Sequence, residues 1–193
     1  MKAIRHIFAA ITAIFLLTLS SAAQTSTWKI DPNHSSVQFV IRHMGVSNVH
    51  GTFGNVTGTI NWNEKDVNKS SVDAVIDATT VNTTVEQRDK HLKSPDFFDV
   101  AKYPTLTFKS TAVKKVNGKL QLVGDLTLAG VTKSVTFDVE GPSAPQTMKG
   151  KTISGFSAHG TLKRSEFNFG PKFAPPMLGD EIKFTIDLEI DKQ

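Results

Sequence analysis

The chain has 193 residues, 22 basic and 18 acidic side chains for a formal net charge of +4, and no cysteine. This length suits one domain with a sizeable core, and the missing cysteines exclude a disulfide scaffold, thiol chemistry and cysteine-ligated metals. The small net charge gives no electrostatic reason to expect nucleic acid as a partner.

Residues 1–23 have the features of a secretory signal peptide. Lys2 and Arg5 precede an apolar run, and small residues lead to an expected cleavage site after Ala23. The run is shorter than the roughly 20 residues that span a bilayer, so an uncleaved anchor is the weaker alternative. Cleavage leaves 20 basic and 18 acidic residues, a net charge of +2, in one domain of residues 24–193. We expect a periplasmic or secreted protein without a stable membrane anchor.

Beyond Gln24, apolar and polar residues alternate with a period of two. The clearest case is Ile182 to Ile190, where every second side chain is apolar. Such segments have one apolar and one wet face, as in antiparallel sheets. Further alternating segments lie at 37–42, 56–62, 72–78, 119–128 and 131–139. The pattern predicts an all-β protein of about eight strands, closed as a sandwich or as an antiparallel barrel.

Small residues on the inward face bear on whether a barrel would be hollow. An eight-stranded barrel has an interior that side chains fill or that holds one small ligand. Six small residues are in phase with the apolar positions: Gly58, Ala74, Ala78, Gly124, Ala158 and Gly160. They favour a cavity, although bulges or close packing would explain them equally well.

One segment near residues 84–98 lacks alternation and predicts a short helix. Thr83 with Glu86, or the pair one residue further on, can form a capping box at its start. Pro95 ends it, because proline disfavours helical geometry in the residue before it. A single helix in a β-protein would serve as a lid over one end of the barrel.

A second irregular segment, residues 168–179, is apolar but holds three prolines, which remove donors from a sheet. Loops are usually polar surface features. A loop that carries Phe169, Phe173, Met177 and Leu178 should therefore pack against something, and the mouth of the barrel is the expected place.

Several segments resemble the YceI-like family. The most specific is Arg88 to Val100, followed by Tyr103-Pro104. The others are Trp28–Asp31, His34-Ser35, Gly51–Phe53 and Gly124–Lys133, so the likeness runs from about Trp28 to the C-terminus. The family's Arg-x-Asp-Phe-Gly pattern is altered by Glu166 and Asn168, and Asn tolerates the left-handed backbone of such a turn. The resemblance implies an extended, lipocalin-like antiparallel barrel in the periplasm, with a polyisoprenoid or similar lipid in its interior.

The resulting main prediction is an exported carrier, not an enzyme, that holds an isoprenoid, quinone-like or fatty-acyl lipid for transport or storage. Phenylalanine has no polar group and suits a dry lumen. The candidate ligand-binding residues of lumen and mouth are Phe39, Ile41, Phe53, Ile76, Arg88, Leu92, Phe97, Phe98, Phe108, Leu126, Phe137, Phe156, Phe169, Phe173, Met177 and Phe184. Arg88 is included as a contact for a phosphate or quinone head group. No catalytic residue, metal ligand or cofactor is expected; a zinc site of His43, His50 and His159 is the weaker alternative.

Two other classes of function stay open. An enzyme acting on an apolar substrate could use Arg88, Asp89 and His91, with His91 or His43 as base, but Asp89 points about 100° away from Arg88 on a helix. An adhesion or envelope-stress module would have a solid interior and no pocket. The sequence also leaves a homodimer open.

Overall fold

The computed structural model describes residues 25–193, which form one antiparallel sheet with a single α-helix. The predicted signal peptide lies outside the described residues. The strands are β1 (Ser26–Ile30), β2 (Ser36–His43), β3 (Ser47–Phe53), β4 (Val56–Trp62), β5 (Ser71–Asp77), β6 (Thr105–Val116), β7 (Lys119–Leu128), β8 (Val131–Glu140), β9 (Gln146–Met148), β10 (Lys151–Lys163) and β11 (Leu178–Lys192). The helix is α1 (Glu86–Lys93), and the 3-10 helices are η1 (Val67–Lys69), η2 (Ala78–Thr80) and η3 (Arg164–Phe167).

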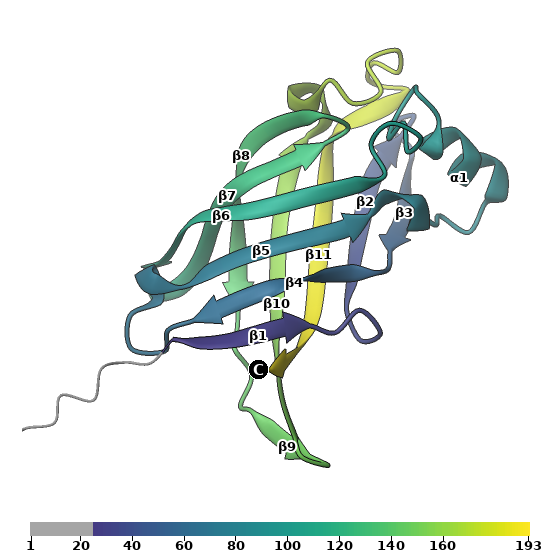
Figure 1. Cartoon of the computed structure of the whole chain (residues 1–193). Helices are drawn as coiled ribbons and strands as arrows, with labels where there is room; N and C mark the ends of the chain where they lie inside the picture. Colours follow the sequence, from purple (N-terminus) through teal and green to yellow (C-terminus); the bar gives the residue numbers. More distant parts are fainter. Residues whose placement is uncertain (1–24) are drawn as a thin grey trace, which may run out of the picture.

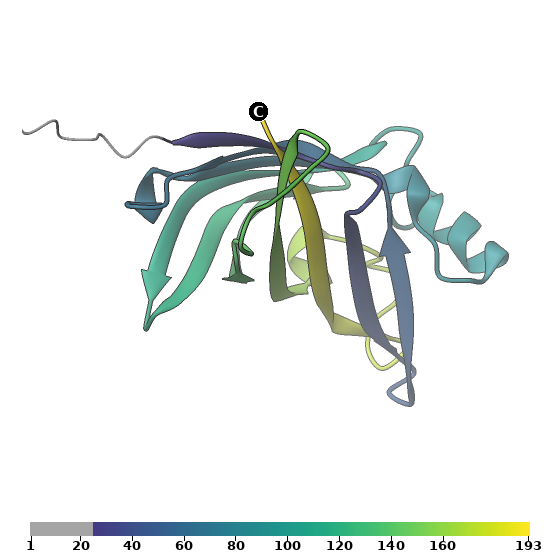
Figure 2. The ribbon, with the colours of Figure 1, turned by 90° about the horizontal axis from the view of Figure 1, so that it is seen from below.

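Eight of these strands close on themselves as a barrel. The order around it is β11, β1, β4, β5, β6, β7, β8 and β10, and the pairing of β10 with β11 completes the circle. Figure 1 shows the barrel from the side, and Figure 2 shows its curved wall from below. The predicted all-β, lipocalin-like barrel with one short helix is confirmed.

Strand β11 has two different neighbours along one of its edges. Its residues Ile190 to Lys192 pair with β1, whereas Leu178 to Asp187 pair with β2, and β3 lies beyond β2. One end of the barrel is therefore walled by β1 and the other by the β2–β3 hairpin (Figure 1). A single bridge between Thr52 and Asn82 joins β3 to the segment that leads into α1.

The end of the barrel beside β1 is filled by side chains. Trp28 and Ile30 of β1 are 6% and 5% exposed, and their cross-strand partners Ile60 and Ile190 are 3% and 1% exposed. Alternation points all four inward, and neighbouring strands bring them into one cluster. We call these four residues the packed end.

The helix α1 begins differently from the sequence prediction. Its N-cap is Val85, which forms no side-chain capping bond, so the predicted capping box is wrong. Instead, the Thr83 amide and hydroxyl both donate to Asp89 Oδ1, at 2.8 and 2.5 Å. The helix ends at Lys93, with Ser94 as its C-cap before Pro95, as expected. Within residues 25–193, no helix has both the length and the apolar character needed to cross a membrane.

The small inward residues do not open the interior. A Cβ at Gly124 would lie 2.4 Å from the Phe108 ring, and one at Gly160 would lie 2.4 Å from the Phe184 ring. A Cβ at Gly58 would meet the backbone of β5 at 2.2 Å. These glycines make room for neighbouring rings and strands, so close packing explains them, as the sequence analysis allowed. None of the six small inward residues lines the cavity described below.

Candidate ligand-binding cavity

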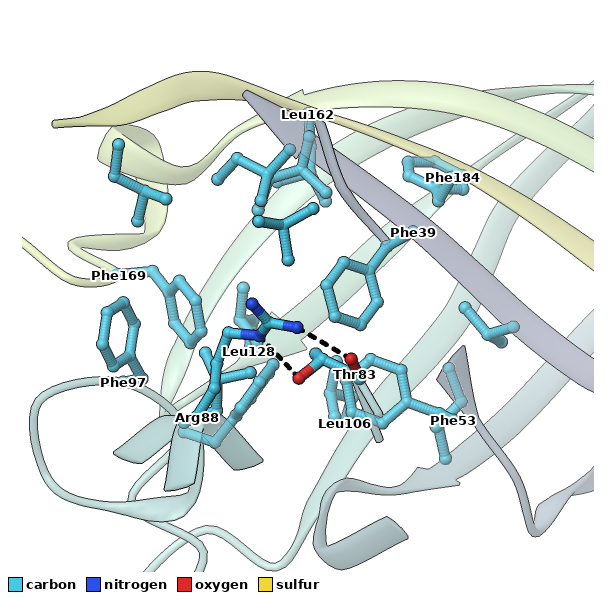
Figure 3. Close-up of a pocket in the computed structure, with 18 of the residues that line it drawn as sticks. Phe39, Phe53, Thr83, Arg88, Phe97, Leu106, Leu128, Leu162, Phe169 and Phe184 are labelled. Atoms are coloured by element: carbon cyan, nitrogen blue, oxygen red, sulfur yellow. Dashed lines mark hydrogen bonds between the residues drawn. The ribbon is translucent and has the colours of Figure 1, made fainter. Parts of the chain in front are cut away.

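A cavity of about 400 Å³ lies inside the barrel at the end covered by α1 and the loop of residues 168–179 (Figure 3). We call this the hollow end. Its apolar lining is Val37, Phe39, Ile41, Val49, Phe53, Ile76, Leu92, Phe97, Phe98, Leu106, Leu126, Leu128, Phe137, Leu162, Phe169, Phe173, Met177, Leu178, Ile182, Phe184 and Ile186. Only four lining residues have polar side chains: His43, Thr83, Arg88 and His91. A site of this composition suits an apolar molecule with at most one polar end.

Fourteen of the sixteen residues proposed from the sequence line this cavity, and their role in binding stays a prediction. Phe108 and Phe156 are not among the lining residues. Phe108 packs 5.0 Å from the Phe137 ring, over Gly124. Phe156 lies 5.4 Å from the Trp62 ring, opposite Leu188. Alternation identifies both as inward residues but does not say which end of the barrel they reach.

Eleven lining residues stand outside the candidate ligand-binding set. Val37, Leu128, Ile182 and Ile186 could have been found, because they follow the same alternation as the residues that were chosen. The others in the lining are His43, Val49, Thr83, His91, Leu106, Leu162 and Leu178. Of these, Leu178 was expected at the mouth, and Thr83 was considered only as a capping residue. His91 was considered only as the base of an enzyme, and His43 as such a base or as a zinc ligand.

Aromatic rings from two separate segments form the roof of the cavity. Phe97 stacks on Phe173 with ring centres 5.0 Å apart and an interplanar angle of 10°. Phe98 contacts Phe169 at 4.6 Å and the Phe53 ring at 5.3 Å. The segment after α1 and the loop of residues 168–179 are thus held together by aromatic packing, a favourable contact beyond burial alone.

Arg88 places a positive charge in the otherwise apolar wall. Its Nε donates to the Thr83 hydroxyl at 2.7 Å and its Nη2 to the Thr83 carbonyl at 2.8 Å (Figure 3). A guanidinium has five N–H donors, so these two bonds fix its position without using its whole capacity. It can therefore bind a ligand's polar head group while staying anchored to Thr83.

Of the three residues considered for catalysis, Arg88 and Asp89 both bind the Thr83 hydroxyl, whereas His91 has a different partner. Asp89 accepts from Thr83, as described above, whereas His91 Nε2 pairs with Asp96 at 3.1 Å. Lys172 Nζ lies 2.6 Å from the other Asp96 oxygen and, together with His91, lowers the pKa of Asp96. These contacts join α1 to the loop of residues 168–179. The arrangement stabilises the roof and resembles no acid–base pair aimed at a substrate.

A buried arginine that sequence reasoning missed shapes the loop of residues 168–179. Arg164 is 4% exposed and donates to five backbone carbonyls. The acceptors belong to Phe169, Gly170, Phe173, Leu178 and Gly179. Burial lowers the pKa of Arg164. Asn168 adopts the left-handed backbone expected of it, with φ of 51°. One cation therefore holds an apolar loop that has few regular backbone hydrogen bonds.

The lining of the cavity reaches the surface at three residues. His43, His91 and Met177 line the cavity and are also exposed. Met177 keeps 48% of its surface exposed. These three residues, one from β2, one from α1 and one from the loop, define the mouth.

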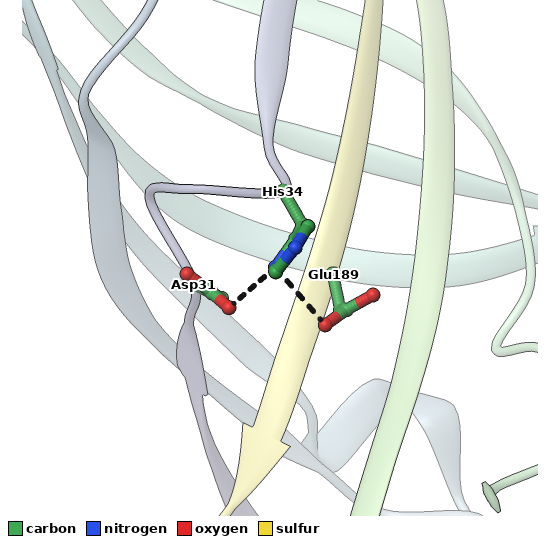
Figure 4. A group of neighbouring side chains, drawn as sticks. All are labelled: Asp31, His34 and Glu189. Carbon is green, nitrogen blue, oxygen red and sulfur yellow. Dashed lines mark hydrogen bonds and ion pairs between the residues drawn. The ribbon is translucent and has the colours of Figure 1, made fainter.

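A polar cluster lies away from the cavity, where the turn after β1 meets β11 (Figure 4). His34 Nδ1 lies 2.8 Å from Asp31 Oδ2 and 3.4 Å from Glu189 Oε1. The hydrogen bond to His34 lowers the pKa of Asp31, and the same bond raises the pKa of His34. Among residues 25–193, Asp31, His34 and Glu189 form the group whose potential metal-ligand atoms lie close together, all within 4.8 Å of one another. The predicted alternative, a zinc site of His43, His50 and His159, is not formed.

Comparisons with known proteins agree with this architecture. The YceI-like domain matches residues 28–190. Protein YceI of Escherichia coli O157:H7 is 38% identical over 181 residues, which cover 93% of this chain and 94% of the relative. The YCEI protein of Campylobacter jejuni, known from a crystal structure, has 34% sequence identity to this chain. The two structures superpose with a TM-score of 0.70 over 79% of this chain and 90% of that one.

A more distant structure shares the fold. The polyisoprenoid binding domain from Saccharophagus degradans is 15% identical, with a TM-score of 0.66 over 86% of this chain and 98% of that one. The domain match and the identity to curated relatives both extend over most of the described barrel. The chain belongs to the YceI-like family.

Proposed function

We propose that this protein is a carrier that binds a long apolar lipid, such as an isoprenoid, quinone-like or fatty-acyl chain, in the cavity of the hollow end. The observation that carries the proposal is the cavity itself, about 400 Å³ with a lining that is apolar except for four residues. This volume lies within the roughly 300–1,000 Å³ of small-molecule sites. The Saccharophagus degradans neighbour, described as polyisoprenoid binding, supports the same class of ligand.

The cavity accommodates only part of a long chain. Trp28, Ile30, Ile60 and Ile190 fill the other end of the barrel. The innermost part of the ligand would therefore stop above the packed end, and the rest would extend toward the mouth at Met177.

Arg88 is the proposed contact for the ligand's head group. Among the described residues that line the cavity, it is the one arginine, and no lysine lines the cavity. A charge-assisted hydrogen bond to a phosphate or carboxylate is about twice as strong as a neutral one. A chain with an anionic or strongly polar end should bind more tightly than a plain hydrocarbon.

The proposed setting is the periplasm or the extracellular space, and the proposed role is transport or storage without catalysis. The signal-peptide features of residues 1–23 support export. The separate partners of Asp89 and His91 support a binding role.

Lipid extraction followed by mass spectrometry tests the proposal. Protein purified under native conditions should release an apolar lipid in near-stoichiometric amount. Leu162→Trp places a large ring in the cavity and should abolish retention, whereas Val116→Trp, on an exposed residue of β6 outside the cavity, should not. Failure of the unaltered protein to retain native lipid or to bind any added fatty acid or prenyl lipid would refute the carrier.

A further inference from the structure

Apolar side chains are exposed together beside the mouth. Met44 and Val46, in the turn between β2 and β3, are 51% and 77% exposed, and Met177 is 48% exposed. The Met44 amide donates to the Met177 carbonyl at 3.0 Å, and a Cβ at Gly45 would lie 4.0 Å from Pro176. The turn and the loop therefore present one continuous surface, which we call the apolar cap. Contiguous exposed apolar patches mark contact sites more often than scattered residues do.

The apolar cap continues directly into the cavity. Met177 belongs to both, since it is exposed on the outside and lines the interior. His43 lines the cavity one residue before Met44. A hydrocarbon chain leaving the cavity at this point would meet the apolar cap before it met open water.

The charges of the cap favour an anionic surface. The two segments that build it, residues 42–48 and 171–177, contain Arg42, His43 and Lys172 and no acidic residue. Lys172 is paired with the Asp96 carboxylate, whereas Arg42 binds the neutral side chain of Asn48, so the uncompensated positive charge of the cap is that of Arg42. The surface depression lined by Phe156, away from the cavity, has instead three acidic side chains, Glu140, Asp187 and Glu189, with one histidine, His34. This asymmetry would orient the protein with its cap toward a negatively charged layer.

We propose that the apolar cap docks reversibly on the surface of a lipid bilayer that contains anionic lipid, with the mouth of the cavity facing the acyl region. The inference rests on the proposed carrier function, because docking gives the cargo a path that avoids water. Each methylene group exposed to water during transfer is unfavourable. Insertion of a few apolar side chains beside a cationic one gives weak, reversible binding and no permanent anchor.

Vesicle sedimentation and lipid transfer test the docking. The docking variant combines Met44→Asn with Val46→Ser; Asn suits the positive φ of 52° at position 44. The control variant combines Val116→Ser with Met148→Ser, two exposed apolar residues of β6 and β9 that belong to neither the cap nor the cavity lining. Circular dichroism and the melting temperature should be the same for all three proteins.

The unaltered protein should sediment with phosphatidylethanolamine–phosphatidylglycerol vesicles and less with phosphatidylcholine vesicles. The docking variant should bind the anionic vesicles roughly tenfold less and accept a fluorescent fatty acid from them correspondingly more slowly. The control variant should behave as the unaltered protein does. Failure of the unaltered protein to bind either vesicle, or unchanged binding by the docking variant, would overturn the inference and leave a protein partner or a second copy to cover the cap.

Vesicle-free titration with a fluorescent fatty acid separates the two proposals. The docking variant should bind this probe in solution with unchanged affinity, because neither substituted residue lines the cavity. If the unaltered protein does not bind the probe at all, the proposed carrier function is wrong. Vesicle sedimentation would then still show whether the protein docks on anionic membranes. If the probe binds but vesicle docking is absent, the carrier function stands alone.

Discussion

The packed end and the hollow end of this barrel have the same alternating pattern but different interiors. At the packed end, β1 lies between β4 and β11, and Trp28, Ile60 and Ile190 meet across neighbouring strands. At the hollow end, the β2–β3 hairpin replaces β1 beside β11, and α1 with the loop of residues 168–179 covers the opening. The comparison teaches that alternation makes a side chain point inward, whereas the elements that the fold brings to each end decide whether the interior there is filled.

Isoleucines of the same strand test this difference most directly. Ile190→Ala should destabilise the protein by about 3 kcal/mol, because it leaves a void in a filled region. Ile182→Ala, on β11 but partly exposed and beside an existing cavity, should cost about 1 kcal/mol. Urea unfolding measures both. Equal losses would mean that the two ends are packed alike, and Ile182→Ala, unlike Ile190→Ala, should also change lipid affinity.

Arg164 offers a way to loosen the hollow end alone. Arg164→Met removes the donors of five carbonyls and should lower the free energy of unfolding by about 3 kcal/mol, since buried acceptors lose their partners. Hydrogen exchange should accelerate in residues 168–179 more than in β1. The neighbouring Lys163→Met, at an exposed position, serves as the control. Exchange that accelerates evenly over the barrel would contradict a local role.

Arg88 tests the polarity of the hollow end. Arg88→Met should raise the Kd for an anionic lipid about tenfold, equivalent to about 1.4 kcal/mol, and leave the Kd for the matching uncharged alcohol unchanged. Asp89→Asn is the control, because it alters the same contact to Thr83 without removing the cation. Competitive fluorescence binding measures the affinities. Equal weakening for both lipids would assign Arg88 to the support of the helix.

The smallest effect concerns the cluster of Asp31, His34 and Glu189 beside the packed end. The pKa of His34 is raised above its ordinary 6.5, so the folded protein binds more protons there than the unfolded chain. Its stabilisation is fully present below pH 6.5 and is lost as pH rises through the raised pKa. His34→Gln should flatten the fall in melting temperature as the pH rises above 6.5.

Asp31 gives the opposite slope in acid. Its pKa is lowered from 3.8, so its stabilisation is present above that pH and is lost as pH falls further. His34→Gln should weaken this acid dependence as well, because His34 is the main cause of the lowered pKa. A melting temperature whose pH profile is the same in the variant would show that the cluster does not contribute.

Much of the site was visible in the sequence. Alternation identified Phe39, Ile41 and Phe184 as inward residues, and the apolar character of residues 168–179 indicated a loop packed at the mouth. These predictions succeeded because strand periodicity and the avoidance of exposed apolar loops are local properties of the chain. The resemblance to the YceI-like family implied the closed barrel, which the structure confirms, and the class of ligand that we propose.

Other features depended on contacts between distant segments. Thr83 binds Asp89 instead of forming a capping box, and Phe108 fills the space that Gly124 appeared to leave open. Neither outcome can be derived from spacing, because each depends on which groups the fold brings together.

By itself, the sequence determined that the strands are antiparallel, which faces are apolar and where regular sheet must stop. Only the tertiary structure decided that β11 changes partner from β1 to β2 along its length, and thereby that one end is solid and the other hollow. It also decided that Arg164 organises the loop over the cavity. The physical reason is that a period of two orients each side chain locally, whereas the filling of the interior depends on which distant segments the fold brings together at each end.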